Sequence, residues 1–360
     1  MNEKLLAIRQ KIDHIDHDIQ RLLNERAQCA HEVGLIKSAE KAEAEASFYR
    51  PEREADILRR IKEANTGPLD DETMVQLFRS IISACLALEK PLTIAILGPH
   101  STFSHHAALK HFGPSMRPTF LNTIRNVFQE VEAKRANYGV IPIENSTEGI
   151  VNHALDMFIH SKLNIIGEVI LAIHHQLLSK AAKNDIVRIY SHQQAFAQCR
   201  QWLDENYPQA ELVAVASTAH AAQIASEEKN AAAIASLMAA ETYHLNILAE
   251  NIEDAHANST RFLVIGHRAP PPSGDDKSSL ALSIPHKPGA LANLLSPFAK
   301  HNINITLLES RPSHSEIWNY VFFLDVTAHQ ENSALPQVLQ ELTDSGVAVK
   351  CLGSYPKAIV

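Results

Sequence analysis

Cysteine is scarce in this sequence, and its placement limits both the redox compartment and the chemistry. Only four cysteines occur among 360 residues, and no two of them form a CxxC pair. This distribution excludes a disulfide framework and a zinc ribbon, and it predicts reduced thiols in a cytoplasmic protein. The cysteines lie far apart along the chain, at Cys29, Cys85, Cys199 and Cys351.

Metal-ligand spacing is also lacking, although the chain has 20 histidines. The adjacent pairs His105–His106 and His174–His175 do not have the spacing that brings two imidazoles to one metal ion, and no HExxH motif occurs. We therefore expect no metal site.

The sequence has no long hydrophobic run and no excess of basic residues. The longest aliphatic stretch, residues 81–88, is interrupted by Ser83 and is far shorter than the roughly 20 residues of a membrane span. The first residues, MNEKLLAIRQ, are charged, so no secretory signal is expected. With 33 Lys and Arg against 41 Asp and Glu, the formal charge of -8 has the wrong sign for binding nucleic-acid phosphates. We expect neither a membrane nor a nucleic acid as a partner.

What remains is the composition of a globular protein, with 45% hydrophobic and 21% charged residues and room for two or three domains. Residues 1–90 have the apolar spacing of helices. Residues 91–267 alternate short β-rich runs with helical ones, which predicts an α/β domain with a largely parallel sheet. Residues 268–279, RAPPPSGDDKSS, have the composition of a solvated linker. Residues 280–360 follow the βαββαβ order of a ferredoxin-like α+β domain.

The first helix carries an apolar seam with one arginine in it. A helix from Lys4 to Lys37 would be roughly 50 Å long, too long for 90 residues to bury alone, so we expect an obligate homodimer, or a tetramer built from two dimers. An arginine on a dry seam needs an anion, and Arg26 therefore either pairs with an acidic side chain across an interface or holds a ligand carboxylate. The seam advances in steps of three and four residues through Leu5, Ile8, Ile12, Ile15, Ile19, Leu22, Arg26, Cys29, Val33 and Ile36.

Two segments of this region, LLAIRQKIDHIDHDIQRLLNERAQCAHEVGLIK and YRPEREADILRRI, resemble the all-helical chorismate mutase family. Such an enzyme folds dianionic chorismate into a reactive conformer and stabilises charge on the ether oxygen, which suits arginines and a lysine. Members of this family act without a cofactor. The resemblance implies binders of the substrate carboxylates and ether oxygen at Arg9, Arg26 and Lys37, with Arg9 acting in the partner's site, and a further functional pair at Arg53 and Glu54.

The sequence departs from the family pattern on the last of these helices. Where a serine and then a glutamine often stand, this chain has Cys85 and Glu89. A glutamate donates a hydrogen bond to the ether oxygen only when protonated, so we predict that the mutase rate falls as the pH rises. The alternative is that Glu89 is a solvated residue at a helix end beside Lys90.

Hydroxyl and amide side chains are concentrated in the turns of the α/β region. In GPHSTFS, Ser101, Thr102 and Ser104 stand at a predicted helix start, where hydroxyls either act as plain N-caps or help to bind an anion. The run PIENSTEG could likewise be a simple turn after a strand.

Taken together, GPHSTFS, PIENSTEGIV, YSHQQAFAQC, ASTAHAA and NSTRFLVIG resemble the prephenate dehydratase family in order and spacing, from about Pro91 to His267. The resemblance implies two α/β lobes around a cleft, as in periplasmic binding proteins. Ser101 stands where the family usually has glycine, so the geometry of that turn is open. The implied substrate site comprises Ser101, Thr102, Asn145, Ser191, Gln198, Thr260, Arg261 and Phe262.

The implied reaction expels CO2 and the ring hydroxyl from prephenate and gives phenylpyruvate. Because aromatisation drives the reaction, the enzyme has to help hydroxide leave as water. We expect Thr260 to donate to the leaving hydroxyl and Arg261 to neutralise a substrate carboxylate. Otherwise, Thr260 is only the threonine of a strand entry.

The last region contains HKPGAL before a helix and LLESRPS in a strand, and these resemble the ACT-type regulatory domain. In that domain family an amino acid binds at a dimer interface, between the start of the first helix and the second strand. The form of these motifs implies L-phenylalanine as the ligand. The alternative is a packing domain that binds nothing. The implied allosteric residues are Gly289, Ala290, Leu291, Glu309, Ser310 and Arg311, with His286 in the same motif.

These resemblances imply a multidomain chain with an all-α N-terminal domain, a two-lobed α/β central domain like the periplasmic binding proteins, and an α+β ferredoxin-like C-terminal domain. They imply that it acts on chorismate and prephenate, needs no cofactor and is inhibited by L-phenylalanine. Two alternatives stay open: a dehydratase with an impaired mutase or a preference for arogenate, and a non-catalytic small-molecule sensor.

Overall fold

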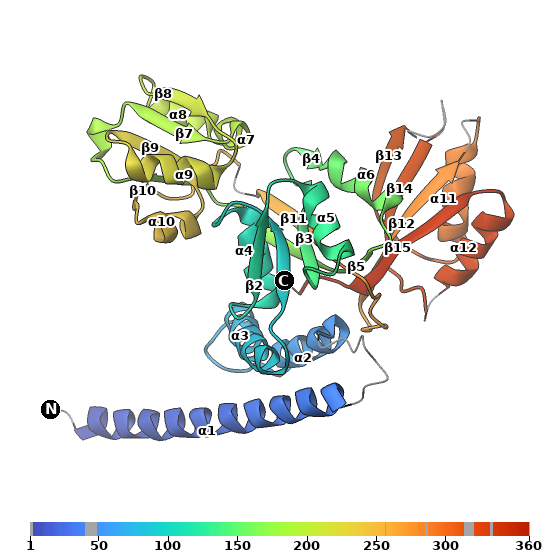
Figure 1. The fold of residues 1–360 in the computed structure, drawn as a ribbon, viewed down its shortest axis with the longest axis horizontal. Helices are drawn as coiled ribbons and strands as arrows, with labels where there is room; N and C mark the ends of the chain where they lie inside the picture. The colour runs from blue at the N-terminus through green and yellow to red at the C-terminus, as the bar shows by residue number, and fades with distance from the viewer. Residues whose placement is uncertain are drawn as a thin grey trace.

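The computed structural model describes residues 3–39, 49–255, 257–284, 287–312, 320–331 and 334–359. His286 of the predicted regulatory motif lies outside these residues. Figure 1 shows the three predicted regions in chain order, with the helical region below and the two sheet-containing regions above it. Within the described ranges, no helix has both the length and the apolar character needed to cross a bilayer.

The N-terminal region is all helix, as predicted. The long helix α1 runs beneath the other two and extends beyond them at its N-terminal end (Figure 1). Pro51 supplies the first turn of α2, and Asp70 caps α3 by accepting a hydrogen bond from the Thr73 amide at 2.7 Å. The helices are α1 (Glu3–Ala39), α2 (Pro51–Ala64) and α3 (Asp71–Glu89).

The central region forms two lobes, each built on its own sheet. In the first lobe the strand order is β2-β1-β3-β11-β5, with β4 paired to β3. Strand β11 returns from the second lobe and inserts antiparallel between β3 and β5. The elements of this lobe are β1 (Thr93–Leu97), α4 (Phe103–Phe112), β2 (Arg117–Leu121), α5 (Ile124–Glu132), β3 (Tyr138–Asn145), β4 (Gly149–Ile150), α6 (Asn152–His160), β5 (Asn164–Ala172) and β11 (Ser259–Gly266).

The second lobe has the strand order β10-β6-β9-β7-β8. Its β7 pairs parallel with β8 and β9, whereas β6 pairs antiparallel with β9 and β10. Both sheets are therefore mixed, and the prediction of a largely parallel sheet is wrong. The elements are β6 (Gln176–Ser179), the 3-10 turn η1 (Lys183–Asp185), β7 (Arg188–Ser191), α7 (Gln193–Gln198), α8 (Arg200–Asn206), β8 (Glu211–Ala214), α9 (Thr218–Glu227), β9 (Ala231–Ala235), α10 (Leu237–Tyr243) and β10 (Asn246–Ala249).

The C-terminal region is the predicted βαββαβ unit, with an antiparallel sheet in the order β13-β14-β12-β15. Its first strand begins at Asp276, so residues 276–279 of the predicted linker belong to a strand. The carboxylate of Asp276 accepts hydrogen bonds from the amides of Ser273 and Gly274, which orders the turn before the strand. The elements are β12 (Asp276–Ile284), α11 (Ala290–Lys300), β13 (Ile305–Pro312), β14 (Tyr320–Val326), α12 (Leu335–Asp344) and β15 (Ala348–Pro356).

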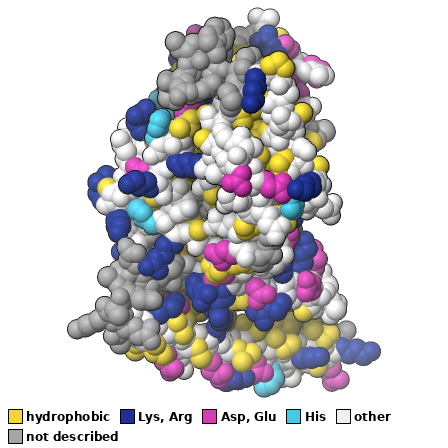
Figure 2. All heavy atoms as spheres, turned by 90° about the vertical axis from the view of Figure 1, so that its right-hand side faces the viewer, with side chains coloured by type: hydrophobic (Ala, Val, Ile, Leu, Met, Phe, Trp, Pro, Cys, Tyr) yellow, Lys and Arg dark blue, Asp and Glu magenta, His cyan; other side chains and the backbone are white. Residues whose placement is uncertain are grey.

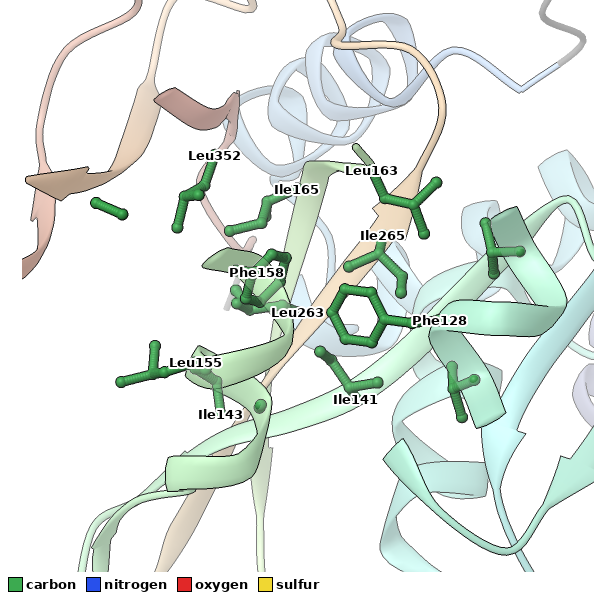
Figure 3. Packing of buried hydrophobic residues seen from close by; sticks show 14 of the residues in the cluster. Phe128, Ile141, Ile143, Leu155, Phe158, Leu163, Ile165, Leu263, Ile265 and Leu352 are labelled. Carbon is green, nitrogen blue, oxygen red and sulfur yellow. The ribbon is translucent and has the colours of Figure 1, made fainter. Parts of the chain in front are cut away.

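One hydrophobic core continues from the first lobe into the C-terminal sheet. Leu352 of β15 lies beside Ile165 of β5 and Phe158 of α6 in the same buried cluster (Figure 3). The approach of the two strands requires a glycine, because a Cβ on Gly353, whose φ is +150°, would come within 2.2 Å of the Ile165 carbonyl oxygen. The C-terminal region is thus packed directly on the sheet that carries β11.

Candidate active sites

The three N-terminal helices surround a pocket of about 370 Å³. Its charged lining consists of four basic side chains against two acidic ones, an excess of positive charge that suits a small dianion. Six of the seven residues predicted for the mutase site line this single pocket. They are Arg26, Lys37, Arg53, Glu54, Cys85 and Glu89, with Arg50 as the fourth basic side chain.

A basic and an acidic side chain of the pocket form an ion pair between α1 and α3. Lys37 Nζ donates to Glu89 Oε2 at 3.0 Å. The helices come close because residue 34 is glycine: a Cβ there would lie 3.1 Å from the Glu89 Cα. Arg26 also faces the pocket, and among the described residues no carboxylate is recorded within ion-pair distance of it.

A second acidic side chain of the pocket, Glu54 of α2, is largely buried. Glu54 is paired with Arg79 at 3.5 Å, and Arg79 also donates to the Lys110 carbonyl of α4. Burial raises the pKa of Glu54 to about 7, while Arg79 acts in the opposite direction. This group therefore changes charge near neutral pH.

Arg9 is the one predicted mutase residue that does not line the pocket. It lies 17 positions before Arg26 on α1, which corresponds to roughly 25 Å along the helix axis. The exposed Arg9 side chain cannot reach the pocket of its own chain. This placement is the one that action in a partner's site requires.

In the central region, Asn145 and Thr260 lie side by side at the junction of the two lobes. Asn145 Nδ2 donates to Thr260 Oγ1 at 2.9 Å, since the two residues are cross-strand partners on β3 and β11. Gln198, from α7 of the second lobe, reaches across and donates to Thr147 Oγ1 at 3.0 Å. Three predicted site residues are thus brought together.

Ser101 also joins the lobes, by a different contact. Its hydroxyl lies 2.7 Å from Thr242 Oγ1 of α10, and its carbonyl accepts from Ser236 Oγ at 3.1 Å. Ser101 has φ +63°, so the turn keeps the left-handed backbone that a glycine adopts easily. Thr102 acts as the N-cap of α4: it accepts from the His105 amide and donates to a strand carbonyl.

Two other predicted residues lie away from this junction. Ser191 is fully buried and donates to the Ile234 carbonyl at 2.8 Å. Phe262 is 1% exposed and packs in the core beneath α4. Neither side chain offers a surface to a ligand in this arrangement of the lobes.

Arg261 points to the opposite face of β11 from Thr260, because successive strand residues alternate. Its guanidinium lies 2.7 Å from Glu168, 2.5 Å from Asp325 and 2.9 Å from the Tyr355 hydroxyl. Burial alone would raise the pKa of Glu168, but Arg261 and Lys277 hold it below its usual range. The structure therefore argues against Arg261 as a ligand of a substrate carboxylate: its guanidinium ties β11 to the C-terminal sheet.

The sequence analysis missed two polar residues at the junction, Asn258 and His175. Asn258 Nδ2 donates to Gln198 Oε1 at 2.9 Å, and His175 Nε2 lies 2.8 Å from the same oxygen. Asn258 begins the NSTRF run, so its proximity to Thr260 was a usable signal. His175 carried no such signal, because it approaches Gln198 only through the fold.

The predicted allosteric residues divide between two faces of the C-terminal sheet. Gly289, with φ +78°, precedes α11, which begins at Ala290 and exposes Leu291. Arg311 pairs with Asp156 of α6 at 3.2 Å, so it faces the first lobe. By strand alternation Glu309 faces the same way, while Ser310 lies on the face that α11 covers. Only Ser310 of that strand triplet therefore shares a face with the start of α11.

Fold and sites together define a multidomain enzyme with a basic pocket for a small anion. Patterns of three families match the chain: chorismate mutase type II at residues 8–90, prephenate dehydratase at 94–270 and the ACT domain at 278–344. The chain is 53% identical to the bifunctional chorismate mutase/prephenate dehydratase of Stutzerimonas stutzeri, over 99% of each chain. It belongs to the family of bifunctional chorismate mutase/prephenate dehydratases and combines both activities.

Solved structures resemble the central and C-terminal regions. The prephenate dehydratase of Arthrobacter aurescens in complex with L-Phe is 32% identical, with a TM-score of 0.68, covering 74% of this chain and 90% of that chain. A protein described as GqqA, a novel type of quorum quenching acylase, is 31% identical with a TM-score of 0.68, covering 74% of this chain and 98% of that chain. Because an acylase shares this fold, the chemistry has to be argued from the site residues.

Proposed function

We propose that the pocket between α1, α2 and α3 is where chorismate becomes prephenate. The observation that carries this proposal is the excess of basic over acidic side chains around one 370 Å³ pocket. In this proposal, Arg26 and Arg53 hold the substrate carboxylates, Lys37 donates to the ether oxygen, and Glu54, Cys85 and Glu89 complete the wall. Disappearance of chorismate and appearance of prephenate on addition of the full chain test the proposal.

The proposed site is completed by a second copy of the chain. The apolar seam of α1 is exposed, with Ile8 57% and Ile12 50% accessible, which supports burial against a partner helix. Figure 2 shows hydrophobic side chains gathered along the lower end of the molecule, where α1 lies. A homodimer would bring Arg9 of one chain to the pocket of the other. Analytical ultracentrifugation of the wild type and of an Ile8→Asp, Ile12→Asp variant tests this assembly.

For the second reaction we propose that Thr260 donates a hydrogen bond to the departing hydroxyl of prephenate, with Asn145 and Gln198 holding it in place. The C–C bond to the carboxylate breaks to release CO2, its electron pair expels the hydroxide as the ring becomes aromatic, and the hydroxide takes its proton from solvent. The contact between Asn145 and Thr260 supports this role, because a threonine is a weak acid and must act by position. Thr260→Ala should abolish most phenylpyruvate formation from prephenate. Unchanged phenylpyruvate formation in that variant would contradict the assignment.

We further propose feedback inhibition by L-phenylalanine bound near Gly289, Ala290, Leu291 and Ser310. Two contacts support communication between the regions: Arg261 ties β11 to the C-terminal sheet, and Lys350 donates to three carbonyls at the end of α6. Inhibition requires that phenylalanine bind one arrangement of the lobes better than another. Calorimetry with L-phenylalanine, with and without a prephenate analogue, tests this coupling.

The proposed compartment is the cytoplasm. All four cysteines are unpaired, and two of them, Cys85 and Cys199, are buried. Burial raises the pKa of the Cys199 thiol well above its usual range, so that thiol stays protonated and inert. Fractionation of the source cells with an antibody against the chain tests this proposal.

A further inference from the structure

A closed ring of side-chain hydrogen bonds lies beside Thr260 and joins the two lobes. Asn145 and Thr147 come from the first lobe, Asn258 directly precedes β11, and Gln198 comes from α7 of the second lobe. The four bonds run from Asn145 Nδ2 to Asn258 Oδ1 at 3.1 Å, from Asn258 Nδ2 to Gln198 Oε1 at 2.9 Å, from Gln198 Nε2 to Thr147 Oγ1 at 3.0 Å, and from Thr147 Oγ1 to Asn145 Oδ1 at 2.5 Å.

The direction of every bond in the ring follows from the backbone. Asn145 Oδ1 accepts the main-chain N–H groups of Thr147 at 3.0 Å and Glu148 at 3.2 Å. Since a backbone N–H can only donate, this oxygen is fixed as an acceptor, and the Asn145 amide cannot be flipped. Its Nδ2 therefore faces Asn258 and Thr260.

The same constraint passes along the ring. Asn258 uses Oδ1 to accept from Asn145, so its Nδ2 must donate to Gln198 Oε1. Gln198 is then left with Nε2 to donate to Thr147, whose hydroxyl closes the ring. Each member donates to the next one. If one side-chain amide were flipped, two donors or two acceptors would face each other and the ring of hydrogen bonds would be broken.

His175 enters the ring from the segment between β5 and β6. Because Gln198 Oε1 is an acceptor, His175 Nε2 must carry the proton, and Nδ1 is the bare nitrogen. Nδ1 is buried without a hydrogen-bond partner in the part of the chain that the structure describes. Burial also lowers the pKa of His175, which favours the neutral ring.

One member of the ring, Asn145, also donates a hydrogen bond to Thr260. Its Oγ1 accepts one of the two Nδ2 hydrogens of Asn145. The Thr260 hydroxyl hydrogen is not needed by the ring, and no acceptor for it is recorded within the described residues. The half-buried side chain can therefore direct this hydrogen out of the ring, toward a bound substrate.

We infer that Asn258 and His175 are positioning residues for the dehydration step: through Gln198 and Asn145 they hold Thr260 with its oxygen as acceptor and its proton free to donate. The inference rests on the proposed function of Thr260 as the donor to the leaving hydroxyl. Since Gln198 belongs to the other lobe, the ring is complete only when the lobes are in this arrangement. Closure of the two lobes therefore also orients the hydroxyl proton of Thr260.

The first test measures prephenate dehydration by the full chain with Asn258→Ala. The expected result is a kcat reduced about ten- to hundredfold with KM within about twofold of wild type, because the ring orients a donor and does not bind the substrate. The control is Asn164→Ala, which removes one hydrogen bond, from Asn164 Nδ2 to the His267 carbonyl, at the far end of the same sheet. An unchanged kcat, or a higher KM alone, in Asn258→Ala overturns the inference.

The second test uses the tautomer of His175. A glutamine places its amide nitrogen near the position of Nε2, whereas an asparagine places it near Nδ1. His175→Gln should therefore keep dehydratase activity within about threefold of wild type, and His175→Asn should lose at least about tenfold. Equal rates in the two variants overturn the inference.

Mutase activity of each variant on chorismate monitors folding. If Asn258→Ala also loses mutase activity, the chain is misfolded and the pair of His175 variants decides. A wild-type protein that does not convert prephenate at all would refute the proposed function instead, so the two failures are distinguishable.

Discussion

Lys37 Nζ and Glu89 Oε2 lie 3.0 Å apart in the mutase pocket, so the two groups expected to contact the ether oxygen of chorismate are bound to each other. Substrate has to replace this contact. An ionised Glu89 would hold Lys37 away from the ether oxygen and could not itself donate. A protonated Glu89 would free the lysine and add a second donor.

This relationship supports the prediction that the mutase rate falls as the pH rises, because a Glu89 carboxylate accepts from Lys37 but cannot donate to the ether oxygen. Glu89→Gln should flatten the pH profile of kcat, because the amide donates at every pH. Glu54, whose pKa is raised to about 7, gains negative charge as the pH rises through that value, and this charge should weaken binding of the dianion. Comparison of Glu54→Gln, Glu89→Gln and the double variant separates the two effects. A pH profile that is the same in all three variants as in wild type would remove both groups from the mechanism.

Arg26 is predicted to be a substrate ligand rather than a structural arginine. Arg26→Ala should lower the kcat/KM of the mutase roughly a hundred- to thousandfold, because a charge-assisted contact to a substrate carboxylate is lost. This factor corresponds to several kcal/mol of lost transition-state stabilisation. Dehydratase activity on added prephenate should survive. Arg21→Ala is the matched control, since Arg21 lies on the same helix, is exposed and pairs only with Asp18 and Glu25 among the described residues. Parallel loss of both activities in Arg26→Ala would mean that Arg26 is structural.

His111 makes the contact between the helical region and the first lobe sensitive to acid. Its Nε2 lies 2.8 Å from the Tyr49 hydroxyl, and burial, assisted by Arg79, lowers its pKa from 6.5 to about 3. The unfolded chain therefore binds a proton between about pH 6.5 and pH 3 that the folded chain does not, and stability falls as the pH falls through that window. A tenfold change in proton affinity is worth about 1.4 kcal/mol, so the loss is on the order of 5 kcal/mol.

We expect His111→Gln, which keeps an acceptor for Tyr49 but does not titrate, to unfold in urea with a much weaker dependence on pH between 6.5 and 4. His220→Gln, at an exposed position, is the control and should behave as wild type. If His111→Gln and wild type lose the same free energy of unfolding on acidification, His111 does not cause the acid sensitivity.

The ion pairs of Arg261 predict how regulation reaches the dehydratase. Tyr355→Phe removes the hydroxyl that contacts Arg261 at 2.9 Å and Ser279 at 2.7 Å, and it leaves the junction where Thr260 lies untouched. Dehydratase kcat without effector should stay within about twofold, whereas the coupling between L-phenylalanine and a prephenate analogue should weaken, and by linkage it must weaken equally in both directions. Full coupling in Tyr355→Phe would exclude this hydrogen bond from the route.

Local patterns predicted much of this structure. The apolar steps of three and four residues give α1 within one or two residues of its bounds, and the βαββαβ order matches β12 to β15. Both features depend on neighbours in the sequence, where periodicity carries information. The mutase residues were implied by the resemblance to the chorismate mutase family, and six of them line one pocket.

What could not be predicted depends on contacts between distant segments. Thr260 and Arg261 are adjacent in TRF, yet the strand sends them to opposite faces, and the partners of Arg261 lie at positions 168, 325 and 355. Residues 276–279 have a polar composition like a linker, but Asp276 and Ser278 are buried in β12. The sheet of the first lobe is mixed because β11 pairs antiparallel with β3 and β5, at least 87 residues earlier in the chain. The sheet of the second lobe is mixed because β6 pairs antiparallel with β9 and β10.

The most direct measurement is incubation of the full wild-type chain with chorismate alone, followed by quantification of prephenate and phenylpyruvate. The account predicts that wild type forms phenylpyruvate, that Thr260→Ala stops at prephenate, and that Arg26→Ala leaves chorismate largely unconsumed. Phenylpyruvate from the Thr260→Ala variant at the wild-type rate, or no product from wild type, would contradict it.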